Sequence, residues 1–139
     1  MHTIQSDVPR CSLRVLLVED SPLLAGRLAE VIRRLHDVEL VGIVDNQANA
    51  IAALERDKPD VLILDLHLRQ GTGFGVLRGM RADAPRPTTL ILTTYDLPEY
   101  RREAQALGAK VFLDKSRDYN RLPQLLLDLL AEKMHDRDP

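Results

Sequence analysis

The sequence predicts an α/β fold built on a five-stranded parallel sheet with helices on both faces. Five short runs of strand-forming apolar residues alternate along the chain with segments of helical periodicity. The run 61–64 has no polar member, which is typical of a strand that helices cover on both sides. Because the connections are short, successive strands are expected to form right-handed βαβ units in one doubly wound domain. The 139 residues, 45% of them hydrophobic, suffice for a single core.

In the N-terminal half, the first three strands are expected at residues 13–18, 40–44 and 61–65. Ser21 followed by Pro22 is a favourable helix start, and the helix should run to about His36. Asn46 can cap a second helix that continues through Arg56. The residues expected to face the core are Leu24, Leu28, Val31 and Leu35 in the first helix and Ile51 and Leu54 in the second.

In the C-terminal half, strands are expected at 89–93 and 110–114, and helices at 74–82, from Pro98 onward, and at about 118–134. Pro85 and Pro87 break the chain before the fourth strand. Gly108 is placed for a left-handed cap at the end of the fourth helix. The inward-facing residues should be Ala104 and Leu107 in that helix and Leu122, Leu126, Leu129 and Leu130 in the last one.

Composition narrows the class of protein. Lys plus Arg total 19 and Asp plus Glu total 21, so the net charge of −2 lacks the basic excess of an electrostatic nucleic-acid binder. The pairs Arg33–Arg34 and Arg101–Arg102 are interpreted as solvated helix faces. The single Cys11 has no internal partner for a disulfide, which favours a reducing, cytoplasmic location.

The domain is expected to span 13–134, with a loose polar extension at 1–12 and a short tail at 135–139. The extension has no apolar core of the kind a secretory signal needs. No apolar stretch approaches the roughly 20 residues of a membrane-spanning helix, so no membrane association is expected.

Most of the polar residues that could bind a ligand or react with one lie at the ends of the expected strands. The first strand leads into Glu19 and Asp20, the third into Asp65, the fourth into Thr93 and Thr94, and the fifth into Asp114 and Lys115. In an open parallel sheet these ends meet at one edge, where ligands bind. Converging carboxylates need a counter-charge, and a set of hard oxygen donors favours Mg²⁺. Asp65 is the best-placed nucleophile for attack on a phosphoryl group.

Four segments together resemble the receiver domain of bacterial two-component response regulators. They are Leu16-Leu17-Val18-Glu19-Asp20-Ser21, Leu64-Asp65-Leu66, Leu92-Thr93-Thr94 and Phe112-Leu113-Asp114-Lys115. The similarity covers about residues 13–133 and implies a flavodoxin-like (βα)5 fold. It is their order and spacing that is specific, since no single segment is distinctive alone.

The resemblance implies a role for each matched residue. Glu19 and Asp20 would be the acidic metal-binding pair, Asp65 the phosphoacceptor, Thr93 the switch hydroxyl, Phe112 the switch aromatic and Lys115 the phosphate-contacting lysine. The backbone carbonyl of His67 would be a further Mg²⁺ ligand.

The resemblance also implies partners. The phosphoryl donor would be a sensor histidine kinase or a phosphotransfer protein. Phosphorylation would then reshape the surface of the fourth helix, fifth strand and fifth helix for a downstream protein, with a homodimer as one possible output. Such a protein assists its own phosphorylation and dephosphorylation but is not an enzyme acting on a separate substrate.

Three residues affect how long a phosphorylated form would last. Ser116 stands where the family commonly has a proline with a cis bond, so a trans bond is expected after Lys115. Thr94 stands where a small side chain is common, which alters access to the phosphoacceptor. The imidazole of His67 gives the hypothesis that it tunes hydrolysis or reports pH, against the alternative of a solvated loop histidine.

Three alternatives remain. A phosphatase of the haloacid dehalogenase type also uses an Asp nucleophile with Mg²⁺, but it expects D-x-D where this chain has Asp65-Leu66-His67. A flavodoxin-like cofactor binder shares the fold class, but Glu19 and Asp20 would repel its phosphate. The chain can also be the receiver fragment of a longer DNA-binding regulator. If the chain is taken as complete, too few residues follow the last helix to form a second domain. The protein is then expected to act by binding other proteins.

Overall fold

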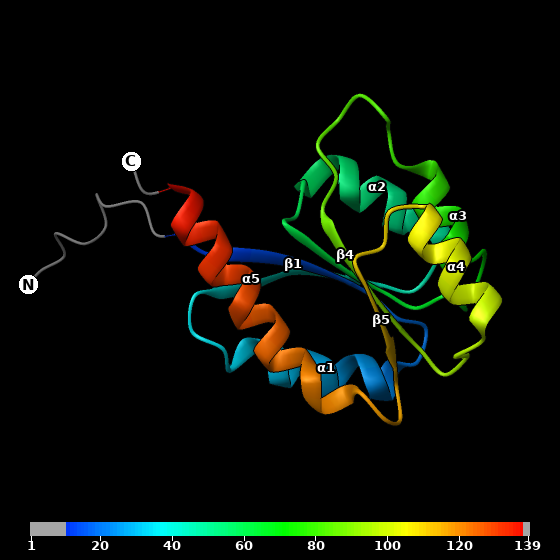
Figure 1. Ribbon diagram of the computed structural model, residues 1–139, viewed down its shortest axis with the longest axis horizontal. Helices are drawn as coiled ribbons and strands as arrows, with labels where there is room; N and C mark the ends of the chain where they lie inside the picture. The colour runs from blue at the N-terminus through cyan, green and yellow to red at the C-terminus, as the bar shows by residue number, and fades with distance from the viewer. Residues whose placement is uncertain (1–10, 138–139) are drawn as a thin grey trace, which may run out of the picture.

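The structure is a computed structural model that describes residues 11–137, and it has the alternating architecture expected from the sequence (Figure 1). The strands are β1 (Leu13–Val18), β2 (Val38–Val44), β3 (Val61–Leu64), β4 (Thr88–Thr93) and β5 (Val111–Asp114). The helices are α1 (Pro22–Arg33), α2 (Gln47–Asp57), α3 (Gly73–Gly79), α4 (Pro98–Ala106) and α5 (Leu122–Arg137). A 3₁₀ turn, Tyr119–Arg121, leads directly into α5.

The five strands form one parallel sheet in the order β2-β1-β3-β4-β5, which confirms the predicted fold class. The chain moves outward from β1 to β2 and then returns to place β3 on the other side of β1. In open α/β sheets such a reversal of strand order leaves a crevice at the carboxyl ends of the two central strands. Here those ends precede Glu19 and Asp65.

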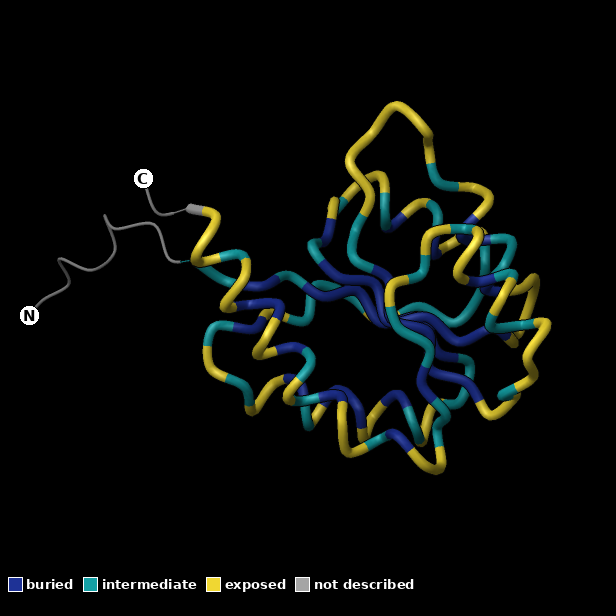
Figure 2. The backbone as a smooth tube through the Cα atoms, in the orientation of Figure 1, coloured by how far each residue is buried: buried dark blue, intermediate teal, exposed yellow. Residues whose placement is uncertain are grey.

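Two apolar layers hold the sheet between the helices. One face of β1, β3, β4 and β5 packs against α1 and α5 through residues such as Leu28, Ile32 and Leu126. The other face packs against α2, α3 and α4 through residues such as Leu64, Val76 and Ile91. Figures 1 and 2 show this arrangement, with α1 and α5 below the sheet, the other helices above it and burial concentrated on the strands. Every residue of β3 is buried, which explains its uninterrupted apolar run.

The helix starts follow the capping residues in the sequence. Ser21 Oγ accepts a hydrogen bond from the Leu24 N–H at 3.3 Å, and Pro22 occupies the first turn of α1. Asn46 Oδ1 accepts from the Asn49 N–H at 2.9 Å at the start of α2. Side-chain oxygens at these positions satisfy backbone donors that lack a partner in the first helical turn. Both caps were predicted, and both are confirmed.

Leu28 is buried as predicted, but the other inward-facing residues of the first two helices differ from the prediction. Ala25, Leu28, Ala29 and Ile32 are the buried residues of α1, and Ala50 and Ala53 are those of α2. Leu24, Leu35 and Leu54 pack at the margins of the two layers, while Val31 and Ile51 are half-buried. The helices α2 and α3 also lie close together. A Cβ on Gly79 of α3, for example, would fall 2.4 Å from Ile51 Cδ1.

Several boundaries also shift. β2 begins two residues earlier than expected, at Val38. α1 ends at Arg33 rather than near His36, and the chain then turns through Asp37, which has a φ of 64°. α3 ends at Gly79 rather than Ala82, because Met80 already has an extended backbone. Gly108 has a φ of 103°, the left-handed conformation expected of it. Since a positive φ costs glycine little, this turn joins α4 to β5 without strain.

The ends of the chain lie largely beyond the described part. Of the extension expected at 1–12, only Cys11 and Ser12 are described. The tail expected from residue 135 is helical as far as Arg137, and 138–139 lie outside the described residues. Among residues 11–137, none of the helices combines the length and apolar character that crossing a membrane requires.

Candidate functional site

Three carboxylates gather at the carboxyl ends of the two central strands. Glu19 and Asp20 follow β1, and Asp65 follows β3. One carboxylate oxygen from each lies within 4.8 Å of those of the other two. The backbone fixes their positions, since the Asp65 N–H donates to Val18 O at 3.0 Å and the Glu19 N–H donates to Val44 O at 2.9 Å. The ladder hydrogen bonds of the sheet therefore extend to the residues that form the cluster.

Lys115 joins this cluster from β5, which lies on the far side of β4. Its Nζ lies 2.6 Å from Asp65 Oδ2 and 2.9 Å from Glu19 Oε1. Its backbone N–H donates to Thr93 O at 2.8 Å, which anchors the residue to the end of β4. Burial by itself would lower the pKa of Lys115, but the hydrogen bonds and charges of Asp65 and Glu19 outweigh burial and raise it. The lysine is therefore a fixed positive charge between two carboxylates.

Glu19 is the most deeply buried carboxyl of the cluster. Its side chain is 1% exposed, and burial raises its pKa from 4.5 to about 7. Hydrogen bonds from Lys115 and the Ser21 N–H oppose this rise, while the charge of Asp65 adds to it. A buried carboxyl next to a second carboxylate is costly to ionise unless a further positive charge is present.

The donor set fits a hard divalent cation. Three carboxylates carry a formal charge of −3, and Lys115 supplies +1, so the cluster has an unbalanced charge of −2. All three acidic side chains offer oxygen, which is the ligand that Mg²⁺ and Mn²⁺ prefer. The charge balance and the oxygen ligands both fit a cation among these side chains.

His67 lies next to the cluster, but its side chain points elsewhere. Its backbone N–H donates to Asp65 Oδ1 at 3.2 Å. Its exposed imidazole stacks on Tyr95, with ring centroids 4.0 Å apart and planes inclined by 27°. The stack joins the β3–α3 loop to the β4–α4 loop beside Asp65.

The residues at the end of β4 have contrasting environments. Thr93 is completely buried, and its Oγ1 accepts a hydrogen bond from the Tyr95 N–H at 3.3 Å. Thr94 is exposed. Phe112 in β5 is half-buried at the margin of the layer under α2, α3 and α4.

Asp114, at the end of β5, stays outside the cluster. Its Oδ1 accepts from the Ser116 N–H at 2.9 Å and from Ser116 Oγ at 2.6 Å, so it closes the turn after β5. These hydrogen bonds lower the pKa of Asp114. The described residues contain no cis peptide bond, so the bond between Lys115 and Ser116 is trans, as expected from the absence of proline.

A second group of charged residues near the site was not predicted from the sequence. Arg101 lies on a partly solvated helix face as predicted, with its side chain 42% exposed, but it also has specific partners. Its guanidinium binds Asp96 and lies 4.7 Å from the centroid of the Phe112 ring. Arg102, by contrast, is exposed as expected. The five-residue separation of Asp96 and Arg101 crosses a helix start, so no regular helical spacing marked them as partners.

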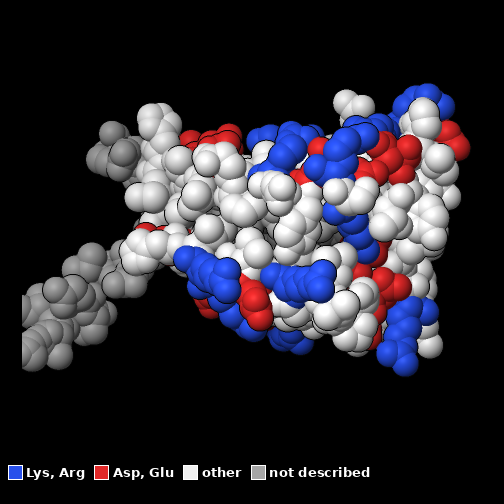
Figure 3. Space-filling model, turned by 90° about the horizontal axis from the view of Figure 1, so that it is seen from below, with Lys and Arg blue, Asp and Glu red and all other residues white. Residues whose placement is uncertain are grey.

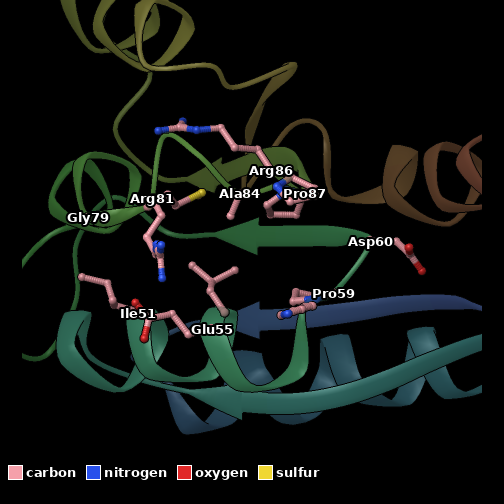
Figure 4. A pocket seen from close by; sticks show the side chains of 13 residues that line it. Ile51, Glu55, Pro59, Asp60, Gly79, Arg81, Ala84, Arg86 and Pro87 are labelled. Carbon is pink, nitrogen blue, oxygen red and sulfur yellow. The ribbon is translucent and has the colours of Figure 1, made fainter.

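A cavity of about 480 Å³ lies at the opposite end of the sheet, between α2 and the segment 80–87 (Figure 4). Pro59 and Asp60, which line it, precede β3, whereas Asp65 follows that strand. Several charged groups on its rim already have partners. Asp60 pairs with Lys133 and Arg81 with Asp83, while Arg86 donates to backbone carbonyls. The cavity therefore lacks a cluster of carboxylates around a lysine like the one at Asp65.

The fold and the site together define a doubly wound α/β domain with an acidic cluster and a lysine at the switch point of its sheet. The family model of the response regulator receiver domain matches residues 15–127, which is most of the chain. The chain therefore belongs to the response regulator receiver domain family.

Curated relatives agree with this assignment. The chain is 33% identical over 121 residues to the transcriptional regulatory protein BtsR of Escherichia coli (strain K12), covering 87% of this chain and 49% of BtsR. It is 30% identical over 121 residues to the sensory transduction protein LytT of Bacillus anthracis, covering 87% of this chain and 48% of LytT. The chain thus spans about half the length of these relatives.

Solved structures resemble the fold. The signal receiver domain of a putative Luxo repressor protein from Vibrio parahaemolyticus has a TM-score of 0.79 and 28% identity, covering 90% of this chain and 95% of that one. The Mn(2+)-bound form of response regulator Rcp1 has a TM-score of 0.70 and 27% identity, covering 84% and 91%. Receiver domains bind Mg²⁺ or Mn²⁺ at an acidic site, and the acidic cluster of this chain is Glu19, Asp20 and Asp65.

Proposed function

We propose that this protein is a phosphoacceptor that receives a phosphoryl group on Asp65 and signals through the resulting conformational change. The observation that carries the proposal is the position of Lys115, whose Nζ lies 2.6 Å from Asp65 Oδ2 within a cluster of three carboxylates. An ammonium held against a nucleophilic carboxylate is suited to receive the negative charge of an incoming phosphoryl group.

Glu19, Asp20 and Asp65 would hold Mg²⁺ through carboxylate oxygens, and His67 through its backbone carbonyl. The bound ion supplies positive charge for the phosphoryl oxygens. Lys115 neutralises a further part of that charge. Because Glu19 and Asp65 already share Lys115, the cluster holds the nucleophile in place before any donor arrives.

The transfer itself is a displacement at phosphorus. An Asp65 oxygen forms the new P–O bond as the P–N bond to the phosphohistidine of a kinase or phosphotransfer protein breaks, and the donor imidazole leaves with the electron pair. The product is an aspartyl phosphate on this chain. Water later cleaves it, so the protein assists its own phosphorylation and dephosphorylation and turns over no separate substrate. The single unpaired Cys11 fits a reducing, cytoplasmic setting.

The signal would pass through Thr93 and Phe112. Once the phosphoryl group is present, the Thr93 hydroxyl turns toward it and Phe112 follows, which changes the surface of α4, β5 and α5. Phosphorylation shifts the population between two arrangements of that surface. A downstream protein or a second copy of the chain then binds the arrangement that phosphorylation favours. Figure 3 shows acidic and basic side chains interspersed on the face that it views, without the single-sign field of an electrostatic nucleic-acid binder.

Intact mass spectrometry tests the proposal. With Mg²⁺ and acetyl phosphate, wild type is expected to gain the mass of one phosphoryl group, and Asp65→Asn to gain none. Asp45→Asn is the matched control, because Asp45 follows β2 at the same edge of the sheet and contacts Asn46 and Arg69 instead of the cluster. A wild-type protein without the adduct, or an adduct that survives in Asp65→Asn, would contradict the proposal.

A second candidate is that this domain is the receiver of a longer transcription regulator. The relatives BtsR and LytT, named as a transcriptional regulatory protein and a sensory transduction protein, match this chain over about half their own length. The phosphorylation chemistry is the same in both candidates, and only the output differs. Binding of duplex DNA by the 139-residue chain itself would overturn the expectation that this domain acts through proteins.

A further inference from the structure

Asp96 joins two segments that come together only in the fold. It lies in the loop between β4 and α4, three residues beyond Thr93. Its Oδ1 accepts from Arg101 Nε at 2.6 Å, and its Oδ2 accepts from Arg101 Nη2 at 3.1 Å and from Arg117 Nη2 at 2.8 Å. We call Asp96, Arg101 and Arg117 the Asp96 clamp. It connects the start of α4 to the loop that follows Lys115.

The clamp also covers Phe112. With both its Nε and Nη2 held by Asp96, the Arg101 guanidinium is fixed over the Phe112 ring, 4.7 Å from the centroid. A cation at this distance attracts the face of an aromatic ring, and the flat guanidinium also shields it from water. The ring is half-buried at the margin of the core, and the guanidinium occupies the space over one of its faces.

A short chain of contacts connects this clamp to the phosphoacceptor pocket. Thr93 Oγ1 accepts from the Tyr95 N–H at 3.3 Å, and Tyr95 directly precedes Asp96. If the Thr93 hydroxyl turned toward Asp65, the Tyr95 N–H would lose this acceptor and the loop would be free to shift. Because Asp96 is the next residue, that shift would move the carboxylate relative to both arginines.

The geometry of the clamp separates it from ordinary surface ion pairs. Isolated exposed pairs contribute little, because the side chains move freely and water screens them. Here one carboxylate, 21% exposed, is held by two guanidinium groups from different segments. Hydrogen bonds from Arg101 and Arg117 lower its pKa to about 2, so Asp96 stays charged at neutral pH. The clamp therefore responds to movement of the loop rather than to the protonation of Asp96.

We propose that Asp96 is a positioning residue that acts through Arg101 to hold Phe112, and that release of this clamp lets the ring follow Thr93. The second part of the proposal rests on the proposed phosphorylation of Asp65. The first part concerns the protein without any phosphodonor and stands independently.

The composition of the chain permits a direct readout. The protein contains two phenylalanines, Phe74 and Phe112, so labelling with fluorophenylalanine gives two ¹⁹F NMR signals. A Phe74→Leu variant identifies the signal of residue 112. In the absence of phosphodonor, Asp96→Asn is expected to move that signal toward the position it takes in phosphorylated wild type. Asp96→Glu, which keeps the charge, should move it less.

Asp83→Asn is the matched control. Asp83 accepts two hydrogen bonds from Arg81 in a surface pair of similar geometry, but this pair lies in the loop between α3 and β4. The Asp83→Asn substitution should leave the ¹⁹F chemical shift of residue 112 unchanged. The rate of phosphorylation by acetyl phosphate should rise in Asp96→Asn and stay unchanged in Asp83→Asn.

The outcomes separate the two parts. A residue-112 signal in Asp96→Asn that coincides with wild type, or that moves equally in Asp83→Asn, overturns the positioning role. A displaced signal with an unchanged phosphorylation rate overturns the coupling to Thr93. If wild type gains no phosphoryl group, the proposed function fails, while the ¹⁹F comparison without phosphodonor still decides whether Asp96 positions Phe112.

Discussion

Replacing Glu19 by Gln should change how stability depends on pH in the protein without metal. In the folded protein, burial raises the pKa of Glu19 from 4.5 to about 7. Between these two values the folded state binds more protons than the unfolded state, so the free energy of unfolding falls as pH rises. The contribution of Glu19 is fully present below pH 4.5 and is lost as pH rises through about 7. Glutamine does not titrate and lacks this dependence.

The size of the effect follows from the two pKa values. A difference from 4.5 to about 7 corresponds to about 3 kcal/mol at most, at 1.36 kcal/mol for each pH unit. The side chain is 1% exposed, so water does little to screen the effect. The free energy of unfolding of Glu19→Gln minus that of wild type should therefore rise by up to about 3 kcal/mol between pH 4.5 and pH 7.

Urea denaturation in EDTA buffer at several pH values measures this difference. Subtracting the wild-type curve removes the contribution of the other titrating groups, which both proteins share. Glu30→Gln is the control, because Glu30 is exposed on α1 and its replacement removes a carboxyl that is not buried. A difference in unfolding free energy between Glu19→Gln and wild type that does not change with pH would refute the argument that burial raises the pKa of Glu19.

Three further predictions concern the cation, the histidine and the core. Mg²⁺ at about ten times its Kd should stabilise wild type by about 1.4 kcal/mol in thermal unfolding, an effect that Asp20→Asn loses and Asp45→Asn keeps. His67→Ala should change the rate at which phosphorylated protein loses its phosphoryl group, because it removes the stack with Tyr95 that joins the two loops beside Asp65, and equal rates at every pH would eliminate that role. Leu126→Ala should cost about 2–5 kcal/mol of unfolding free energy, since this side chain is completely buried between α5 and the sheet, whereas exposed Leu127→Ala should cost far less.

The layers of the fold could be predicted because they follow from local patterns. The uninterrupted apolar run of β3 marked a strand covered on both faces, and the caps at Ser21 and Asn46 marked two helix starts. The leucines of α5 were assigned correctly to the core, but in α2 the alanines face inward and the larger side chains lie at the margin. Hydrophobicity identifies the apolar side of a helix, while the distance to its neighbour decides which side-chain size fits there.

The site was partly predictable for the same reason. Parallel strands place their carboxyl ends at one edge, so Glu19, Asp20 and Asp65 were expected to lie together, and the structure brings them within 4.8 Å of one another. The position of Lys115 depended on β5 lying beside β4, with the residue's own N–H bound to Thr93 O. Asp114, one position earlier, ends β5 at the same edge of the sheet, yet its carboxylate closes the turn at Ser116.

The sequence by itself determined the alternation of strands and helices, the buried strand that ends at Asp65 and the set of acidic and basic groups at the strand ends. These properties depend on residues close together in the chain, where burial, capping and periodicity leave a readable pattern. Only the tertiary structure decided which charges pair, as in the Asp96 clamp, where Arg101 covers Phe112 and Arg117 reaches the same carboxylate. Such pairing depends on how loops of adjacent strands meet, and the order of strands in the sheet, rather than their order in the chain, sets that geometry.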